Sequence, residues 1–506
     1  MESDAGVVVI GTGPAGAAAA WTLHRAGIPV TVLEAGSRTS AGGLTVRGPG
    51  MTLFRRRRPL PDATPQDAAP NGGEAQWIYE LSAGGLSNHW TCAVPRFAPE
   101  DFTDGAALDE RFRWPVGYQD LADHYSAMER LLHIAGSGLD VQHLPGGHVS
   151  HRLRLAADWG PVVEQASARG HGLTPLPLAW SGGWTVTRSG TPFNSFVRML
   201  QDIPQSPRFR VLFGARALRL EWSGEQRRVR RVVFRDEAGE EQALAADAFV
   251  LAAGALGSTR LLLQSRSADF PQGLGNAEGV LGRYLHDHPL AKVALTLSRP
   301  LSVHPAVLLT RGPYDDASRL RGVATILWSG TALRLRSLGT LTPGKSRRIG
   351  FNLFGMFPPS ERSFVALAGG GDAAPLDIRI SFDQEVQAML LAARERLVEI
   401  LEAAGHRASI DLWHVGPPGA SVHYGGTARM HHSSRFGMLD GWNRLHAVPN
   451  VLVVDAAAFT TGPEKNPTLT AMALASRACE KLAADLRAGG GRTRSRVSLA
   501  APVTAT

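Results

Sequence analysis

The chain has 506 residues, of which 44% are hydrophobic and 19% are charged. This composition supports a large apolar core, in two or three domains or in one interleaved body, and it excludes a disordered or fibrous chain. The net charge of +8 comes mainly from scattered arginines without a nucleic-acid fold signature, so we expect no nucleic-acid partner and interpret the Arg run at 55–58 as a solvated loop tip.

The cysteine count and the lengths of the apolar runs indicate in which cellular compartment the protein works. Cys92 and Cys479 are too few for a disulfide framework or a Cys-based zinc site. A reducing compartment is the simpler interpretation, and we expect a cytoplasmic protein. No apolar run is long enough for a membrane span, and the apolar N-terminal run lacks the basic region of a secretory signal.

Residues 7–36 read VVVIGTGPAGAAAAWTLHRAGIPVTVLEAG and predict a strand, a tight turn, a helix and a second strand. Gly11 permits the turn, Gly13 lets the backbone approach a pyrophosphate, and Gly16 lets the helix pack on the strand. The strand before the glycines and the helix after them make this a strong dinucleotide signal.

The same segment favours FAD over other dinucleotides. The helix that begins around Pro14 and Ala15 would point its N-terminus at the phosphates. Glu34 ends the second strand, where its carboxylate can accept hydrogen bonds from a ribose diol and would repel the 2′-phosphate of NADP. FAD and NAD remain, and a dinucleotide fold at the start of so long a chain favours FAD.

The next segments are an excursion, a helix and a group of strands. Residues 37–76 are rich in Gly, Pro and Arg and predict a long excursion. After the turn at Trp114-Pro115, a helix is predicted with an apolar face made of Leu121, Tyr125, Met128 and Leu132. Strands are predicted within 209–257, and a helix follows over 256–263. The last strand ends in Ala253 and Gly254, which are small enough to pass beside a bound cofactor.

The pattern of residues 290–420 predicts a separate domain. Strands are predicted at 292–298 and 376–382, and a long amphipathic helix at 383–405. The composition of residues 487–506 predicts a disordered tail.

The C-terminal part carries the most information about chemistry. A strand runs into a turn of small residues at Asp455 and Ala456, and a helix follows with Asn466 at its N-cap and Pro467 at N1. The N–H groups of Thr468 and the next residue would then face the negative charge of a reduced flavin.

Three polar residues have two interpretations each. Asn466 is either a plain N-cap or a side chain at a reacting flavin. His423, in HYGGTARM, is either a turn histidine or a catalytic one. His89, in GGLSNHWTC at 84–92, is either a hydrogen-bonded structural residue or a neighbour of the cofactor.

Together these segments resemble the glucose–methanol–choline (GMC) oxidoreductase family. The resemblance rests on the N-terminal GTGPAG and LEAG and on WPVGYQDLADHYSAME, LAAGALGSTRLL, LGRYLHDHP, HYGGTARM and VVDAAAFTTGPEKNPTLTAMALA. GGLSNHWTC is most similar to the pyranose 2-oxidase branch, which includes bacterial glycoside 3-oxidases. The resemblance implies an α/β fold in which a Rossmann-type FAD-binding domain is interleaved with an α+β substrate-binding domain built on an antiparallel sheet.

The resemblance also implies roles for single residues. His423 matches the catalytic histidine, and Asn466 matches its paired residue. His89 matches the histidine to which some members attach FAD covalently, whereas others bind FAD without a link, and both alternatives stay open. Thr91 matches a residue near flavin N5.

The loop around His89 would lie beside the flavin. It contains Gly84, Gly85, Ser87 and Asn88, and Asn88 stands where the branch often has threonine. The long oligomerisation insertions of fungal members have no counterpart, so we expect a monomer or a small homo-oligomer. Because DHP at 287–289 fits the family's flavin domain, we expect no metal at the neighbouring histidines.

The implied domain organisation interleaves the two bodies. We expect the FAD-binding domain in 1–110, 191–289 and 421–486, a helical cap segment that contributes to the substrate domain in 111–190, the substrate-binding domain in 290–420, and the tail in 487–506. Residues 344–363 lie where the branch has a mobile substrate loop, and their Gly, Pro and aromatic content suits a lid or an ordinary connection.

The implied activity is the oxidation of a secondary hydroxyl of a sugar or glycoside to a ketone. His423 would remove the hydroxyl proton while hydride moves to flavin N5, Asn466 would hold the same oxygen, and the electrons would pass to O2 or a quinone-type acceptor. One alternative is a GMC-type enzyme for another alcohol, such as a polyol, a sterol or a secondary metabolite. A flavin-binding protein without redox turnover is the other.

Overall fold

The fold is described from a computed structural model. It describes residues 6–38, 45–48, 51–55, 68–69, 77–78, 80–180, 185–187, 193–302, 304, 306–311, 323–328, 344–369, 374–380, 382 and 384–489.

The first large sheet carries the dinucleotide segment. Its strands are, in order, β11 (Phe209–Leu212), β2 (Val30–Leu33), β1 (Val7–Ile10), β15 (Ala248–Leu251), β24 (Val448–Val453) and β23 (Arg444–Leu445). The first five are parallel, and β23 pairs antiparallel with β24. β1 is fully buried in the middle, as its apolar run VVVI requires. Parallel strands end at one edge, so the residues after β1, β2, β15 and β24 meet there.

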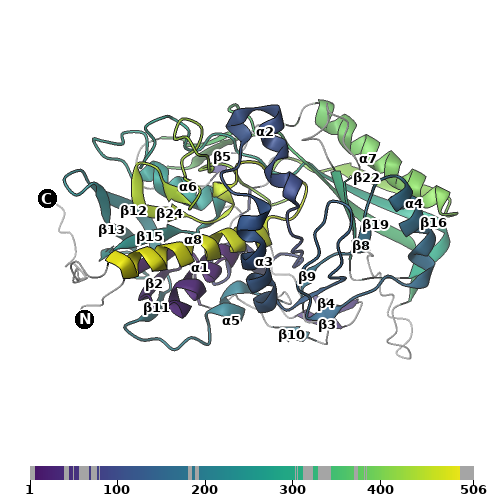
Figure 1. Cartoon of the computed structure of the whole chain (residues 1–506), viewed down its shortest axis with the longest axis horizontal. Helices are drawn as coiled ribbons and strands as arrows, with labels where there is room; N and C mark the ends of the chain where they lie inside the picture. Colours follow the sequence, from purple (N-terminus) through teal and green to yellow (C-terminus); the bar gives the residue numbers. More distant parts are fainter. Residues whose placement is uncertain are drawn as a thin grey trace.

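Helices cover this sheet. α1 (Pro14–Arg25) packs on β1, β2 and β15, α8 (Thr468–Gly489) lies along α1, and α3 (Tyr118–Leu132) crosses α8 (Figure 1). The alanines at 17–20 are fully buried, which lets α1 approach its neighbours closely. The predicted apolar face of α3 is confirmed, because Leu121, Tyr125, Met128 and Leu132 are all buried.

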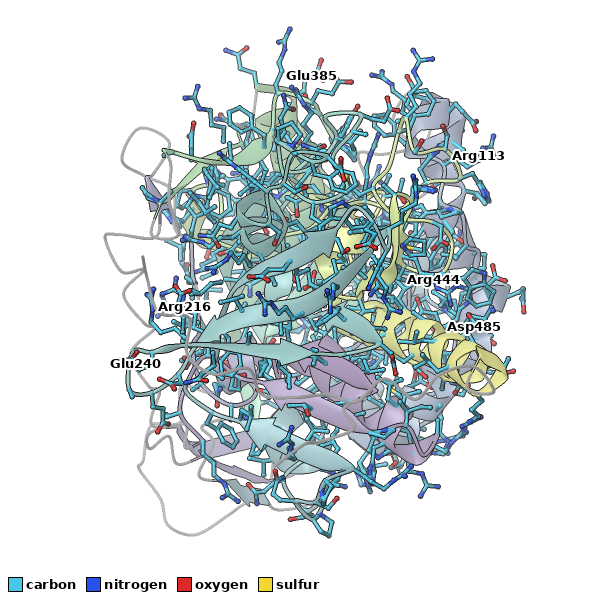
Figure 2. All side chains as sticks on the ribbon, turned by 90° about the vertical axis from the view of Figure 1, so that its left-hand side faces the viewer. Arg113, Arg216, Glu240, Glu385, Arg444 and Asp485 are labelled. Atoms are coloured by element: carbon cyan, nitrogen blue, oxygen red, sulfur yellow. The ribbon has the colours of Figure 1, made fainter. Side chains whose placement is uncertain are left out.

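Smaller elements complete this half of the molecule. They are α2 (Asp104–Leu108), α5 (Ser195–Met199), α6 (Gly254–Gln264), the 3-10 helices η1 (Gly85–Asn88), η2 (Pro99–Phe102), η3 (Glu110–Phe112) and η5 (Ala456–Ala458), and an antiparallel sheet of β12 (Arg216–Ser223), β13 (Arg228–Arg235) and β14 (Glu241–Ala245). Figure 2 faces this sheet and shows Arg444 of β23 pointing toward Asp485 of α8, with which it forms an ion pair. The pair ties the edge strand to the helix that starts beside Asn466.

The second large sheet is antiparallel and belongs to the other half. Its strands are, in order, β22 (Ala408–Val415), β16 (Leu290–Ser302), β19 (Lys345–Gly355), β18 (Val323–Trp328), β17 (Val307–Leu309) and β8 (Leu173–Pro175). α4 (Gly160–Ala168), η4 (Ala157–Trp159) and α7 (Gln384–Ala403) cover one face, where Val293, Phe351 and Leu353 form an apolar core with α7 residues (Figure 1). Alternate side chains therefore face the other half of the molecule.

Three small sheets join segments distant in sequence. They are β10 (Thr185–Thr187) with β3 (Thr45–Gly48) and β4 (Met51–Arg55), β20 (Phe364–Leu367) with β21 (Leu376–Arg379) and β5 (Ala68–Ala69), and β7 (His151–Arg152) with β6 (Ile134–Gly136) and β9 (Leu178–Ala179). The expected excursion at 37–76 thus contains a hairpin where it is described, and residues 56–58 of the Arg run lie outside the described residues.

Three expectations from sequence need correction. The lid or ordinary connection expected at 344–363 is wrong for its first part, because 345–355 is strand β19, whose Ile349, Phe351 and Leu353 alternate into the core. The strand expected at 376–382 is shorter and lies with β20 and β5 outside the six-stranded antiparallel sheet. Helix α8 extends to Gly489, so the start of the expected tail is helical; residues 490–506 lie outside the described residues.

Candidate active site

The predicted phosphate loop connects β1 to α1. Gly11 has a φ of +104°, and a Cβ on it would lie 2.5 Å from the carbonyl oxygen of Ala252. A Cβ on Gly16 would lie 2.1 Å from the carbonyl oxygen of Gly11, so the helix approaches the strand only without a side chain. On Gly13, by contrast, a Cβ would meet no described atom within 4 Å. Gly11 and Gly16 are therefore required by close backbone packing, whereas Gly13 faces open space at the start of α1.

The first turn of α1 is suited to an anion. Pro14 stands at its start, and in the described chain no side chain caps the turn and no acidic residue lies in it. Its first N–H groups, including those of Ala15 and Gly16, have no partner within the helix and point outward along its dipole. This is the arrangement that binds a pyrophosphate.

Glu34 lies at the end of β2 as predicted, and the chain holds its carboxylate in place. The N–H of Thr12 (3.1 Å), the hydroxyl of Thr12 and the N–H of Gly36 (2.9 Å) all donate to it. Burial raises the pKa of Glu34 above its ordinary value despite these hydrogen bonds. Each carboxylate oxygen can accept two hydrogen bonds, so Oε1 can still accept one from a ribose hydroxyl.

The ends of β15 and β24 meet at the same edge. Ala253 and Gly254 are exposed although β15 is fully buried, and a Cβ on Gly254 would meet no described atom within 4 Å. Asp455 accepts hydrogen bonds from the Ser258 hydroxyl (2.5 Å) and from the N–H of Ala457 (2.9 Å), which ties the turn at Ala456 to α6. The exposed backbone here continues the open edge that begins at Gly13.

The loop at 84–92 lies over the phosphate loop. The N–H of Gly84 donates to the Thr12 hydroxyl (2.9 Å), and a Cβ on Gly85 would lie 3.4 Å from the Cα of Gly13. Ser87 and Asn88 are buried, and their side chains bond to backbone carbonyls of the loop itself. Those two side chains shape the loop, and direct contact of Ser87, Asn88 or the exposed Thr91 with a flavin stays a prediction.

His89 is held by a carboxylate. The Nε2 atom of His89 lies 2.5 Å from Oε2 of Glu80, and both side chains are largely buried. A carboxylate only accepts hydrogen bonds, so Nε2 carries the proton in this pair. Glu80 was not singled out from the sequence, because nothing in the sequence indicates that it would reach His89.

The structure brings His423 and Asn466 together. The amide Nδ2 of Asn466 lies 3.2 Å from Nε2 of His423, across 43 positions of sequence. Nδ1 of His423 and Oδ1 of Asn466 are buried, and neither has a hydrogen-bond partner among the described residues. The expected N-cap at Asn466 is wrong by one residue, because the carbonyl of Pro467 accepts the first helical bond and α8 begins at Thr468. Asn466 is therefore available for the histidine.

Residues of the DHP segment surround this pair. The carboxylate of Asp287 accepts hydrogen bonds from the N–H of His423 (2.9 Å), the N–H of Gly419 (3.1 Å) and the Ser421 hydroxyl. The ring of His288 stands edge-on to the ring of His423, with 4.9 Å between centroids, and its Nδ1 lies 3.1 Å from the carbonyl oxygen of Gly355.

Burial controls the protonation of these groups. Burial, and then the charge of His288, holds the pKa of His423 well below its ordinary value. Burial lowers the pKa of His288 to about 4 and raises that of Asp287 to about 6, against the hydrogen bonds that Asp287 accepts. At neutral pH His423 is thus a neutral imidazole whose lone pair on Nε2 faces the amide of Asn466.

A buried ionic cluster follows directly after this pair. The ammonium of Lys465 donates to Asp101 (2.8 Å) and Glu464 (2.7 Å). The guanidinium of Arg311, from the end of β17, lies 3.5 Å from Asp101 and 3.8 Å from Glu464, and Asp104 lies 3.3 Å away. The charges of GPEKNP were visible in the sequence, but their partners were not.

The open edge fits FAD. Gly13 and Gly254 leave space for a ligand, the N-terminus of α1 offers unpaired N–H groups, and Glu34 can receive a ribose. His423 and Asn466 each keep a buried polar atom without a partner among the described residues, as a pair that binds a ligand would.

Comparison with known proteins agrees with this geometry. The family described as FAD binding domain matches residues 6–348, and the family described as GMC oxidoreductase matches residues 359–475. The chain belongs to the GMC oxidoreductase family.

This GMC oxidoreductase is similar to three curated proteins over most of their length. They are paromamine 6′-oxidase of Streptomyces fradiae (28% identity over 95% of this chain and 91% of the relative), 2-methyl-1,2-propanediol dehydrogenase of Mycolicibacterium austroafricanum (26%, 93% and 94%) and C-glycoside 3-oxidase of Arthrobacter globiformis (27%, 88% and 83%). The crystal structure of pyridoxine 4-oxidase from Mesorbium loti shares the fold, with a TM-score of 0.64 at 19% identity over 94% of this chain and 98% of that chain.

The predictions of family, fold and enzyme class are confirmed. The protein is an FAD-dependent oxidoreductase that acts on CH–OH groups. The pyranose 2-oxidase branch stays a prediction, because relatives with different named substrates have similar identities, 26–28%, to this chain. Within the described residues, no helix is both long and apolar enough to cross a membrane, and no group of three or more His, Cys, Asp or Glu side chains is placed to hold a metal.

Proposed function

We propose that this protein oxidises a secondary hydroxyl of a sugar or glycoside to a ketone, with His423 as the base. The observation that carries the proposal is the pairing of His423 and Asn466 at 3.2 Å, with buried atoms that have no described partner. FAD, held by the open edge, supplies the ring that accepts a hydride equivalent from the alcohol carbon. A pure flavin binder would need neither polar residue.

The roles of the two residues follow from their chemistry. Neutral His423 accepts the hydroxyl proton at Nε2, and its lowered pKa keeps that nitrogen free of protons at neutral pH. Asn466 donates from Nδ2 to the same oxygen and keeps it within reach of the base. Asn466 does not titrate, so the pair contains a single base.

A polar row on the sheet face that carries Phe354 supports a substrate rich in hydroxyl groups. The ring of Phe354 on β19 lies 5.5 Å from that of His423, so this face of the strand looks toward the site. Asn352 lies on the same face, roughly 7 Å along the strand. It is directly opposite Lys292 of β16, which is opposite His414 of β22. An aromatic ring followed by amide, ammonium and imidazole groups suits a glycoside better than a sterol.

The relatives support the same substrate class without deciding it. Paromamine 6′-oxidase and C-glycoside 3-oxidase are named for sugar-derived substrates, whereas 2-methyl-1,2-propanediol dehydrogenase is named for a diol. The test is anaerobic bleaching of the flavin with a panel of D-glucose, D-glucosamine, methyl β-D-glucopyranoside, a C-glucosyl aromatic, 1,2-propanediol and cholesterol. We expect a sugar or glycoside to bleach fastest and its product to carry a ketone at C2 or C3 by NMR. Fastest bleaching by the diol or the sterol would overturn the substrate class.

The acceptor is tested in the same preparation. We propose that the reduced enzyme passes electrons to O2 or to a quinone-type acceptor. Reoxidation by air and by benzoquinone, each followed by the return of the flavin spectrum, separates the two. Failure of both to restore the spectrum would contradict the proposal.

His423→Ala tests the base directly. We expect the variant to retain FAD and to fold, because the ring is partly exposed and not part of the apolar core. Without general-base catalysis, the flavin should be reduced about 10²- to 10⁴-fold more slowly by the best panel alcohol. Reduction at the parent rate would remove His423 from the mechanism.

A further inference from the structure

The segment that carries His423 has a strained backbone. Val422 has a φ of +61°, in the left-handed region that a β-branched residue rarely adopts. Such a conformation costs of order 1–3 kcal/mol and persists only where the surroundings impose it. Among the described residues, the carboxylate of Asp287 accepts three hydrogen bonds from this segment.

Asp287 binds the residues on both sides of the strained Val422. Oδ1 accepts the N–H of His423 at 2.9 Å and the hydroxyl of Ser421, and Oδ2 accepts the N–H of Gly419 at 3.1 Å. The Ser421 hydroxyl also accepts the N–H of His288 at 3.2 Å. The donors before and after Val422 thus converge on one buried carboxylate, and the chain between them turns through the left-handed region at Val422.

We propose that Asp287 is the positioning residue of the catalytic base: its carboxylate holds segment 419–423 with Val422 left-handed, and this conformation sets His423 against Asn466. The inference rests on the base role proposed for His423. Asp287 itself does not contact the imidazole through its carboxylate; it binds the backbone N–H of His423. A displacement of about 1 Å at the base is enough to slow a reaction roughly 100-fold.

The test is a double-mutant cycle of Asp287→Asn and Val422→Gly. Asn has one acceptor oxygen and an NH2 group, so at least one donor of the segment would face another donor. We expect flavin reduction to be about 10- to 100-fold slower, with little change in substrate affinity. Glycine adopts the left-handed region without strain, so Val422→Gly alone should stay within a few-fold of the parent, and in its background Asp287→Asn should recover about tenfold.

The rescue separates positioning from charge. If Asp287 acted only through its negative charge, Val422→Gly would restore nothing, and a double variant as slow as Asp287→Asn overturns the proposal. Parental rates in Asp287→Asn overturn it as well. Should Asp287→Asn fail to retain FAD, Ser421→Ala carries the test, since it removes the hydroxyl donor to Asp287, together with the acceptor of the His288 N–H, and should slow reduction several-fold.

A structural readout is independent of the substrate. In a crystal structure of FAD-loaded Asp287→Asn, we expect Val422 to leave the left-handed region and Nε2 of His423 to move out of hydrogen-bond reach of Asn466. An unchanged 3.2 Å contact would overturn the proposal even if no panel alcohol reduces the flavin. Slow reduction in His423→Ala together with fast reduction in Asp287→Asn rejects the positioning role alone, whereas fast reduction in His423→Ala rejects the base.

Discussion

Protonation of Asp287 should set the acid limit of flavin reduction. Burial raises the pKa of Asp287 to about 6, whereas the pKa of His423 is held well below its ordinary value. As the pH falls through about 6, the carboxylate therefore gains a proton while the base is still neutral. A protonated carboxyl has one O–H donor and less acceptor capacity, so it cannot accept all three hydrogen bonds from His423, Gly419 and Ser421 as the carboxylate does. We expect the anaerobic reduction rate to be flat above this pH and to fall below it.

The measurement is the limiting reduction rate across the range from about pH 5 to pH 8. His286, His288 and His423 surround Asp287, and the pKa values of His286 and His288 are lowered to about 3 and about 4, so neither titrates in this window. Asp287→Asn should abolish the acid limb along with most of the rate. An acid limb that survives unchanged in this variant would assign the titration to another group.

Covalent attachment of FAD, if it occurs, is predicted at His89. Its Nε2 donates to Glu80 at 2.5 Å, and a covalent link at that nitrogen would replace the hydrogen bond and leave a largely buried carboxylate short of one partner. We therefore expect non-covalent FAD, with the yellow colour in the supernatant after acid precipitation. His89→Asn is the matched control and should give the same partition. Colour that stays with the parent polypeptide and is lost in His89→Asn would establish the link.

At the scale of elements, a substitution in the turn between β1 and α1 should weaken cofactor binding without affecting the stability of the fold. Gly13 has a φ of −59°, and an added Cβ would meet no described atom, so Gly13→Ala should leave the stability of the apoprotein within about 0.5 kcal/mol. The same methyl group would lie where the pyrophosphate approaches, so FAD affinity should fall by about tenfold or more, at least 1.4 kcal/mol. The measurements are FAD content after dialysis and thermal unfolding of the apoprotein.

The control is Gly160→Ala at the start of α4, which also adds a methyl group in open space without a positive φ. It should change neither quantity. Full FAD retention by Gly13→Ala would place the pyrophosphate elsewhere.

This turn also shows what the sequence can predict. Gly11, Gly13, Gly16 and Glu34 lie within one short segment whose strand, turn and helix have to fold together, so their roles follow from local pattern. The role of Asp287 depends on hydrogen-bond donors that lie 132–136 positions away in the sequence, and no local pattern indicates them. Strand β19 was missed for another reason: glycines and prolines of 344–363 suggested a loop, although Ile349, Phe351 and Leu353 alternate as a strand requires.

For the whole molecule, the buried cluster at Arg311 joins the two halves. Arg311 comes from the antiparallel sheet side and is fully buried against Asp101 and Glu464 of the FAD-binding side. Arg311→Met would leave these carboxylates with Lys465 alone, and an uncompensated buried charge costs about 3–5 kcal/mol. For a chain of this length that is a fall in melting temperature of roughly 3–5 °C, measured on the FAD-loaded protein. Arg396→Met is the control, because its pair with Glu399 is half exposed and contributes about 0–1 kcal/mol. A melting temperature equal to the parent's would show that the two halves are held together without Arg311.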